Sequence, residues 1–302
     1  MWRTASCLRR PFVVATASAA TAATYYAQSK GSALSDTTTS SSTLYASWFC
    51  PYVQRVWIAM EEKGIPYSYV EINPYEAATA PGTYTKKALS LDEKRRRYPG
   101  FVEASPRGLV PALVCADGGD AASERKAVCD SAVLLEFLEE NWPNAPALLP
   151  DLAAERAHVR YWCVFAAERI IPFYYRMLMA TDDEARAAAK TQILSGLTEF
   201  ARACDANGPY FMGERFGTAD LWLFPWYERL VTVGAAYRGF EAPNTAEFAR
   251  LEEWHAAVRA RPSVVRTLAD ADELIANYSG YADNSATSDA AVRFRAGGSR
   301  RA

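Results

Sequence analysis

The sequence predicts an α/β domain followed by an all-α domain, and three observations support this. Between residues 43 and 142, short β-type runs alternate with amphipathic helical segments. From 152 to 277 the pattern is helical throughout, and 143–151 between them is proline-rich, as is typical of a linker. A chain of 302 residues with 50% hydrophobic content is long enough for two domains.

Composition excludes several function classes. The net charge of −2 gives no indication of a nucleic-acid partner, and no stretch is apolar enough to predict stable membrane insertion. The chain has six cysteines without a C-x-x-C pair and only two histidines, so we expect neither a disulfide framework nor a metal site. Reduced thiols fit a cytosolic or organelle-matrix setting.

Both ends of the chain differ in composition from the middle. Residues 1–42 contain several arginines and many Ser, Thr and Ala, with no acidic residue before Asp36. This is the composition of a mitochondrial transit peptide, which predicts a mitochondrial location; a disordered tail and a cytoplasmic location are the alternative. Residues 278–302 are rich in Ser, Gly and Asp, and we expect them to be disordered.

The α/β domain begins with a thiol at a strand-to-helix junction. Thr43–Phe49 predicts a strand, and Pro51 suits the first position of a helix. Cys50 lies between them, where unpaired backbone N–H groups and the helix dipole favour a thiolate. We therefore predict that Cys50 is a nucleophile with a lowered pKa.

A second strand and a long polar connection follow. Tyr67–Ile72 alternates as a strand, and Asn73–Glu103 is long for a connection inside one domain, with partial helical character at Thr85–Leu91. Its charged run, Asp92–Arg97, is either a solvated helix face or a set of cations near an anion-binding site.

The end of the domain contains a proline-led strand and another helix. Ala112–Cys115 predicts a buried strand, and Val110-Pro111 precedes it. A cis peptide there could expose the backbone of Val110, but a trans proline is favoured on sequence alone. Asp130 and Ser131 open a helix, where the Ser131 hydroxyl either caps the helix or holds a ligand carboxylate.

In the helical half, one segment is apolar nearly all round. Ala219–Trp226 is therefore expected to be a helix in the middle of the bundle, with Asp220 as a capping group near its start. Cys163 and Cys204 fall on apolar stripes of other helices and are expected to be core residues.

These motifs together resemble a known family. C-P-Y at the strand-to-helix turn, S-P-R-G-L-V-P-A-L and D-S before a helix look like the N-terminal domain of a glutathione transferase, which implies a thioredoxin-like fold and a helical C-terminal domain. A cysteine at 50 and F-P-W-Y-E-R-L at 224–230 resemble the omega class. Dithiol glutaredoxins share the C-P-Y start but have a second cysteine where this chain has Val53.

The resemblance implies roles for individual residues. Cys50 would be the catalytic nucleophile and glutathione the co-substrate. The residues implied to bind glutathione are Tyr52, Val110, Pro111, Asp130 and Ser131. Those implied to line a pocket for the second substrate are Tyr161, Arg169, Phe173 and Trp254, although Trp254 could equally be a core residue.

One part of the family pattern has no clear counterpart. A lysine that omega proteins use for the glycyl carboxylate of glutathione is missing. We hypothesise that Lys94 or one of Arg95, Arg96 and Arg97 takes its place.

Three functions compete. The first is a glutathione-dependent thiol transferase that reduces mixed disulfides or small oxidised substrates such as dehydroascorbate. The second is conjugation of glutathione to electrophiles, and the third is a non-catalytic glutathione-binding or interaction protein on the same fold. The resemblance also implies a homodimer.

Overall fold

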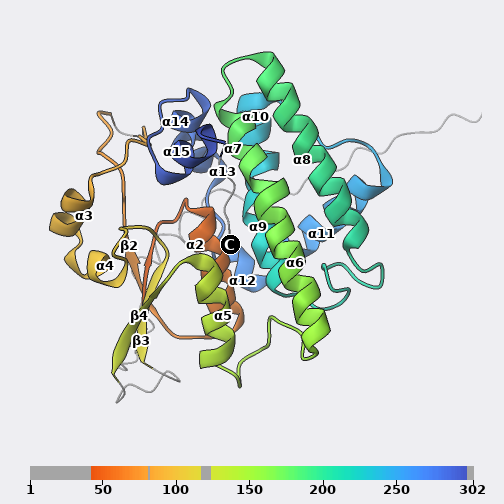
Figure 1. Ribbon diagram of the computed structural model, residues 1–302, viewed down its shortest axis with the longest axis horizontal. Coiled ribbons are helices and arrows are strands. Elements are labelled where there is room, and N and C mark those ends of the chain that lie inside the picture. Colours follow the sequence, from red (N-terminus) through yellow and green to blue (C-terminus); the bar gives the residue numbers. More distant parts are fainter. Residues whose placement is uncertain (1–41, 81, 117–123, 298–302) are drawn as a thin grey trace, which may run out of the picture. The chain divides into compact units, whose positions relative to one another are not determined.

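The computed structural model describes residues 42–80, 82–116 and 124–297. All but Ser42 of the predicted transit peptide lies outside these residues. The predicted division into an α/β half and a helical half is confirmed (Figure 1).

The N-terminal domain contains a four-stranded mixed sheet with the order β2-β1-β3-β4. β1 pairs in parallel with β2 and antiparallel with β3, and β3 pairs antiparallel with β4. Helices α2 and α5 lie on the side of the sheet toward the helical domain, and α3 and α4 lie on the other side (Figure 1). This is the thioredoxin-like arrangement. The elements are β1 (Thr43–Ala46), α2 (Pro51–Glu62), β2 (Ser68–Glu71), α3 (Leu91–Arg97), α4 (Pro99–Ala104), β3 (Ala112–Ala116), β4 (Arg125–Cys129) and α5 (Ser131–Asn141).

Helix α2 forms as its sequence predicts. Pro51 occupies its first position, with Cys50 as the residue that precedes it. Val53, Val56 and Met60 are fully buried along one face. Gly64 follows the helix with φ of 64°, a conformation that glycine adopts without steric cost.

The second half is built around α9, in which every residue is buried. α9 packs against α2, α6 and α11, so it joins the two domains. Among the described residues, no helix combines the length and apolar character needed to cross a membrane. The helices of this half are α6 (Ala153–Arg169), α7 (Ile171–Met179), α8 (Asp183–Ala203), α9 (Thr218–Arg229), the π-helical η2 (Leu230–Gly234), α10 (Ala235–Arg238), α11 (Ala246–Arg259), α12 (Pro262–Val265), α13 (Ala271–Asn277), α14 (Ser279–Ala282) and α15 (Asp289–Arg295).

The connection after β2 differs from expectation. Residues 85–90 are extended rather than helical, and the main chain of Tyr75 pairs with that of Ala88. The helix begins only at Leu91, because the Ser90 hydroxyl accepts the N–H of Glu93 at 3.2 Å and caps it. The charged run Asp92–Arg97 therefore forms most of α3.

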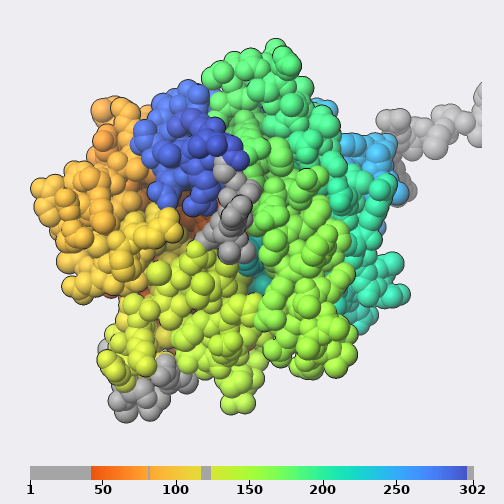
Figure 2. All heavy atoms as spheres, viewed as in Figure 1, coloured from red at the N-terminus to blue at the C-terminus, as the bar shows by residue number. Residues whose placement is uncertain are grey.

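The prediction of disorder after residue 277 is wrong for residues 278–297. We call residues 270–297, which contain α13, α14 and α15, the C-terminal segment. The rings of Tyr281 and Phe294 pack on the ring of Tyr175 in α7. Their centroids lie 5.4 Å and 4.8 Å, respectively, from the Tyr175 centroid. Figure 2 shows this segment (blue) between the N-terminal domain (orange and yellow) and the helices of the second half (green). A few well-placed aromatic rings fix a segment whose composition is polar.

Asp220 holds the start of α9. The residue is 1% exposed. Its Oδ1 accepts the N–H of Phe211 at 2.9 Å and the Nε1–H of Trp254 at 2.7 Å, and its Oδ2 accepts the N–H of Gly217 at 2.9 Å. A Cβ at Gly217 would lie 2.5 Å from the carbonyl oxygen of Leu148. The close approach of these two chain segments therefore requires glycine.

Replacing Asp220 with Ala is expected to leave three buried donors without an acceptor. Because each unsatisfied buried group costs about 1–3 kcal/mol, the free energy of unfolding should fall by about 3 kcal/mol or more, as measured by urea denaturation. Asp182→Ala, at the exposed cap of α8, is the control and should cost about 1 kcal/mol. Equal losses in the two variants would contradict this role for Asp220.

Candidate active site

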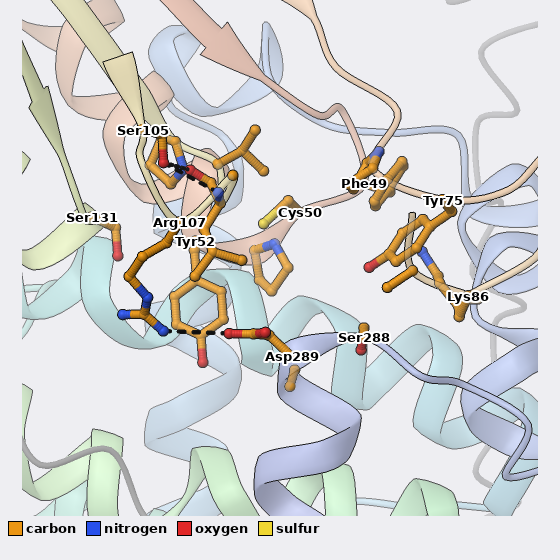
Figure 3. A pocket seen from close by; sticks show the side chains of 18 of the residues that line it. Phe49, Cys50, Tyr52, Tyr75, Lys86, Ser105, Arg107, Ser131, Ser288 and Asp289 are labelled. Carbon is orange, nitrogen blue, oxygen red and sulfur yellow. Dashed lines mark hydrogen bonds and ion pairs between the residues drawn. The ribbon is translucent and has the colours of Figure 1, made fainter. Parts of the chain in front are cut away.

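A cavity of about 440 Å³ opens beside the β1–α2 turn (Figure 3). Most of its wall comes from the N-terminal domain, including the connection after β2, and the rest comes from α7 and the C-terminal segment. Within the described residues, no group of three or more His, Cys, Asp or Glu side chains is placed to hold a metal ion. The predicted residues Cys50, Tyr52, Val110, Pro111, Asp130 and Ser131 all line this cavity.

Cys50 lies at the centre of the labelled residues in Figure 3. Burial raises the pKa of its thiol, which is the reverse of the lowered pKa that we predicted. The backbone N–H groups of Val53 and Tyr52 at the start of α2 act in the predicted direction, as do the cations Arg229 and Lys86. The sequence therefore identified the backbone N–H groups, but neither the two cations nor the loss of solvent that opposes all of them.

Arg229, from the end of α9, lies buried behind this turn. Its guanidinium donates to the carbonyl oxygens of Phe49 at 3.0 Å and Pro225 at 2.7 Å. It also donates to Oε1 of Gln54 at 2.8 Å and to the hydroxyl of Tyr278 at 2.9 Å. One side chain thus fixes the main chain next to Cys50 relative to α9 and the C-terminal segment.

Tyr52 reaches the cavity from the first turn of α2, and Val110 reaches it from the loop before β3. The Tyr52 ring packs edge-on against Trp226 of α9, with centroids 4.8 Å apart. The Val110-Pro111 peptide is cis, so the trans form favoured on sequence alone is wrong. Both residues of this peptide line the cavity.

The residue that caps α5 is not the one that the sequence predicted. Asp130, not Ser131, caps α5, because its Oδ1 accepts the N–H of Ala132 at 3.0 Å. Its φ of 80° is in the left-handed region that a non-glycine residue adopts only at a local cost. The buried hydroxyl of Ser131 has no hydrogen-bond partner among the described residues. An unpaired buried hydroxyl on a cavity wall is a natural site for a polar ligand group.

The charged run supplies one cation to the cavity. Lys94 is buried, lines the cavity and donates from Nζ to the carbonyl oxygen of Gly108 at 3.1 Å. Arg95, Arg96 and Arg97 are exposed and do not line it. Both interpretations of the run are thus partly correct, because α3 has a solvated face and one inward-facing lysine.

Arg107, which is outside this run, also lines the cavity. It forms an exposed ion pair with Asp289 of the C-terminal segment (Figure 3).

The structure does not bring the four predicted second-substrate residues to the cavity. Tyr161 is 62% exposed, and Arg169 is also on the surface. Phe173 is partly buried under the guanidinium of Arg176. Trp254 is 0% exposed and bonded to Asp220, so the core interpretation of this residue is the correct one. The error arose because helical spacing identifies a buried face but not what that face contacts.

Sequence reasoning missed several residues of the connection after β2, of α7 and of the C-terminal segment that line the cavity. They are Tyr75 and Lys86 of the connection after β2, Tyr175 of α7, and Tyr278, Tyr281, Ser288, Asp289, Ala290 and Arg293 of the C-terminal segment. The aromatic pair Tyr278 and Tyr281, three residues apart in a polar tail, was the available signal, since isolated large rings in such a tail need a packing partner.

Comparison with known proteins fits this geometry. Residues 49–141 match the glutathione S-transferase N-terminal domain model, and residues 183–257 match the C-terminal domain model. The crystal structure of glutathione transferase Omega 3C from Trametes versicolor is 32% identical, with a TM-score of 0.67, over 88% of this chain and 98% of that one. The chain belongs to the glutathione S-transferase family.

Two plant relatives are similar over much of their length. Glutathione S-transferase U26 of Arabidopsis thaliana is 25% identical over 76% of this chain and 89% of its own. Glutathione S-transferase DHAR3, chloroplastic, of the same plant is 26% identical over 76% of this chain and 72% of its own. As a glutathione transferase, the chain has its cavity at the β1–α2 turn of the thioredoxin-like domain, beside the cis-proline.

Ser131→Ala is expected to leave the ligand-free transferase as stable as before, or more stable by up to about 1 kcal/mol, because the lost hydroxyl is buried without a partner. Glutathione should then raise the melting temperature of the variant less than that of the wild type. Both quantities follow from thermal denaturation with and without glutathione.

Ser288→Ala provides the matched control. Its hydroxyl is also buried, but it bonds with the Tyr281 hydroxyl at 2.6 Å and accepts the N–H of Ala291 at 3.1 Å. This variant should lose stability. A larger loss for Ser131→Ala than for Ser288→Ala would show that the Ser131 hydroxyl is bonded after all.

Proposed function

We propose that this glutathione transferase is an omega-like thiol transferase that uses Cys50 to reduce mixed disulfides or small oxidised substrates such as dehydroascorbate, with glutathione as the reductant. The observation that carries the proposal is a cysteine thiol, in place of a hydroxyl, at the N-terminus of α2 on the wall of the cavity. Val53 occupies the place of the second cysteine of a dithiol motif.

The chemistry proceeds in two balanced exchanges. The Cys50 thiolate attacks the glutathione sulfur of a mixed disulfide, the substrate leaves as a thiolate that takes up a proton, and Cys50 becomes bonded to glutathione. A second glutathione thiolate then attacks the glutathione sulfur of this adduct. Oxidised glutathione leaves and the Cys50 thiolate is regenerated, so each mixed disulfide consumes one free glutathione, and the other half of the oxidised product is the glutathionyl group taken from the substrate.

The cavity offers groups for each end of glutathione. The Ser131 hydroxyl and the N–H groups at the start of α5 would hold the carboxylate of the γ-glutamyl end, and Asp130 would face its amino group. The backbone of Val110 would pair with the cysteinyl part. Lys94 would bind the glycyl carboxylate, because it is the member of the charged run that lines the cavity.

The alternatives make different use of the same site. Conjugation of glutathione to electrophiles requires only that the site lowers the pKa of the glutathione thiol, whereas a cysteine thiol on the cavity wall beside it favours disulfide exchange. A non-catalytic binding protein would hold glutathione without turnover.

We also propose that the protein forms a homodimer and has a mitochondrial location, with the cytoplasm as the alternative. Light scattering would test the homodimer, and imaging of the tagged full chain would test the location.

Cys50→Ser is expected to abolish glutathione-dependent reduction of hydroxyethyl disulfide and dehydroascorbate, because serine cannot form the disulfide intermediate. Cys129→Ser is the matched control, since Cys129 is a second thiol on the cavity wall. It should retain activity, because a second glutathione resolves the adduct.

Three outcomes would redirect the proposal. Loss of activity in Cys129→Ser would indicate a resolving thiol instead of the monothiol mechanism. Conjugation of glutathione to an electrophile that survives in Cys50→Ser would favour the second function. A stable Cys50–glutathione adduct without turnover in the parent would favour a binding protein.

Lys94→Ala is expected to raise the KM for glutathione roughly tenfold or more, since a charge-assisted hydrogen bond contributes about 1.5–3 kcal/mol. Arg95→Ala, Arg96→Ala and Arg97→Ala should leave this KM unchanged, because their side chains are exposed away from the cavity. An unchanged KM in Lys94→Ala, or a raised one in an arginine variant, would contradict the assignment.

A further inference from the structure

Lys86 is a buried cation within the cavity wall. Lys86 is 2% exposed to solvent. Its Nζ lies 3.8 Å from the ring centroid of Phe49, the residue next to Cys50, and 4.6 Å from that of Tyr75. The rings of Tyr278 and Tyr281 complete an aromatic cage, with centroids 5.3 and 5.9 Å from Nζ. Figure 3 shows Lys86 and Tyr75 on the same side of Cys50.

The C-terminal segment holds Lys86 in this position. The carbonyl oxygen of Lys86 accepts the N–H of Thr287 at 2.9 Å, and Asn277 Oδ1 accepts a hydrogen bond from its Nζ. Gly280 lies directly against the side chain, because a Cβ there would approach the Lys86 Cβ to 3.1 Å. A flexible side chain is thus fixed at both ends, and this ordering has a cost in conformational entropy.

The charge of Lys86 is incompletely matched. An ammonium group has three donors, and Asn277 is the one hydrogen-bond acceptor found for it in the described part of the chain. No carboxylate within those residues lies within 4 Å of its Nζ. Aromatic faces attract a cation but do not neutralise it, and a buried cation without an anion is costly. The site therefore favours an anion close to Lys86.

We propose that Lys86 is a positioning residue for Cys50, and that its ammonium group is the cation that stabilises the Cys50 thiolate. This inference deepens the proposed function and depends on Cys50 as the nucleophile. Arg229, the other cation near Cys50, uses its donors on Phe49, Gln54, Pro225 and Tyr278 and so holds the main chain. Lys86 has donors to spare.

The charges on Lys86 and Cys50 depend on each other. Burial lowers the pKa of Lys86, and the negative charge of a Cys50 thiolate opposes that change. Burial raises the pKa of Cys50, and Lys86 opposes that change in turn. The ion pair forms when the thiol loses its proton and the amine holds one. The other ionisable groups that face the pair are Arg229 and three tyrosines. Arg229 favours the thiolate but also helps to lower the pKa of Lys86, and the hydroxyls of Tyr75, Tyr278 and Tyr281 have raised pKa values, so that they stay neutral.

The test measures the rate at which iodoacetamide alkylates Cys50 in the ligand-free full chain as a function of pH, with the modified peptide quantified by mass spectrometry. Lys86→Met keeps an unbranched apolar chain in the aromatic cage but removes the charge. We expect the midpoint of its pH profile to rise by at least about one unit, so that the rate below the midpoint falls roughly tenfold. Lys86→Arg, which keeps the charge, should lie between Lys86→Met and the wild type.

Lys190→Met is the matched control. It removes a cation that lies over the ring of Phe240 and does not line the cavity, so it makes the same change in net charge. Its pH profile should match that of the wild type. Should Lys86→Met fail to fold, as judged by circular dichroism, Lys86→Gln supplies a neutral variant that still donates to Asn277.

An unchanged alkylation midpoint in a folded neutral variant would overturn the proposal. If the same variant also raised the KM for glutathione, the anion that Lys86 meets would be a glutathione carboxylate. Because alkylation requires no turnover, the test remains informative even if the chain shows no transferase activity, and the two failures can be told apart.

Discussion

The architecture of the site depends on one buried guanidinium. Arg229 leaves α9 and donates to Phe49, Gln54, Pro225 and Tyr278, which belong to the β1–α2 turn, α2, α9 and the C-terminal segment. A buried arginine is tolerated only when its donors are satisfied, so these four parts of the chain must meet for the guanidinium to be accommodated there. The cavity beside Cys50 is thus a product of tertiary contacts and not of the thioredoxin-like domain alone.

The two sides of the cavity differ in chemistry. On one side, the N-terminal domain offers backbone groups, a cap carboxylate, an unpaired hydroxyl and Lys94, which suit a zwitterionic peptide such as glutathione. On the other side, aromatic rings surround Lys86 in a region that excludes water. Loss of water strengthens every interaction between charges there, which explains why the thiol of Cys50 is both harder to ionise without a partner and more responsive to one.

Local rules predicted the local features. Pro51 set the start of α2 and the apolar run at 219–226 set the central helix, because each depends on neighbours along the chain. Cys50 and the predicted glutathione-binding residues on the cavity wall were found through short motifs that carry their own geometry. Features set by distant contacts could not be found in this way. They include the desolvation of Cys50, the burial of Trp254 against Asp220 and the packing of the tail on Tyr175, which joins residues more than a hundred positions apart.

The C-terminal segment lies beyond residue 257, where the match to the transferase C-terminal domain ends. It contributes side chains to the cavity yet no element to the sheet or to the central helix α9. Leu274, Tyr278, Tyr281 and Phe294 of this segment nevertheless belong to the hydrophobic core, and Tyr278 accepts a hydrogen bond from Arg229. One stretch of chain therefore serves both the stability of the fold and the shape of the cavity, so a substitution there changes the two together.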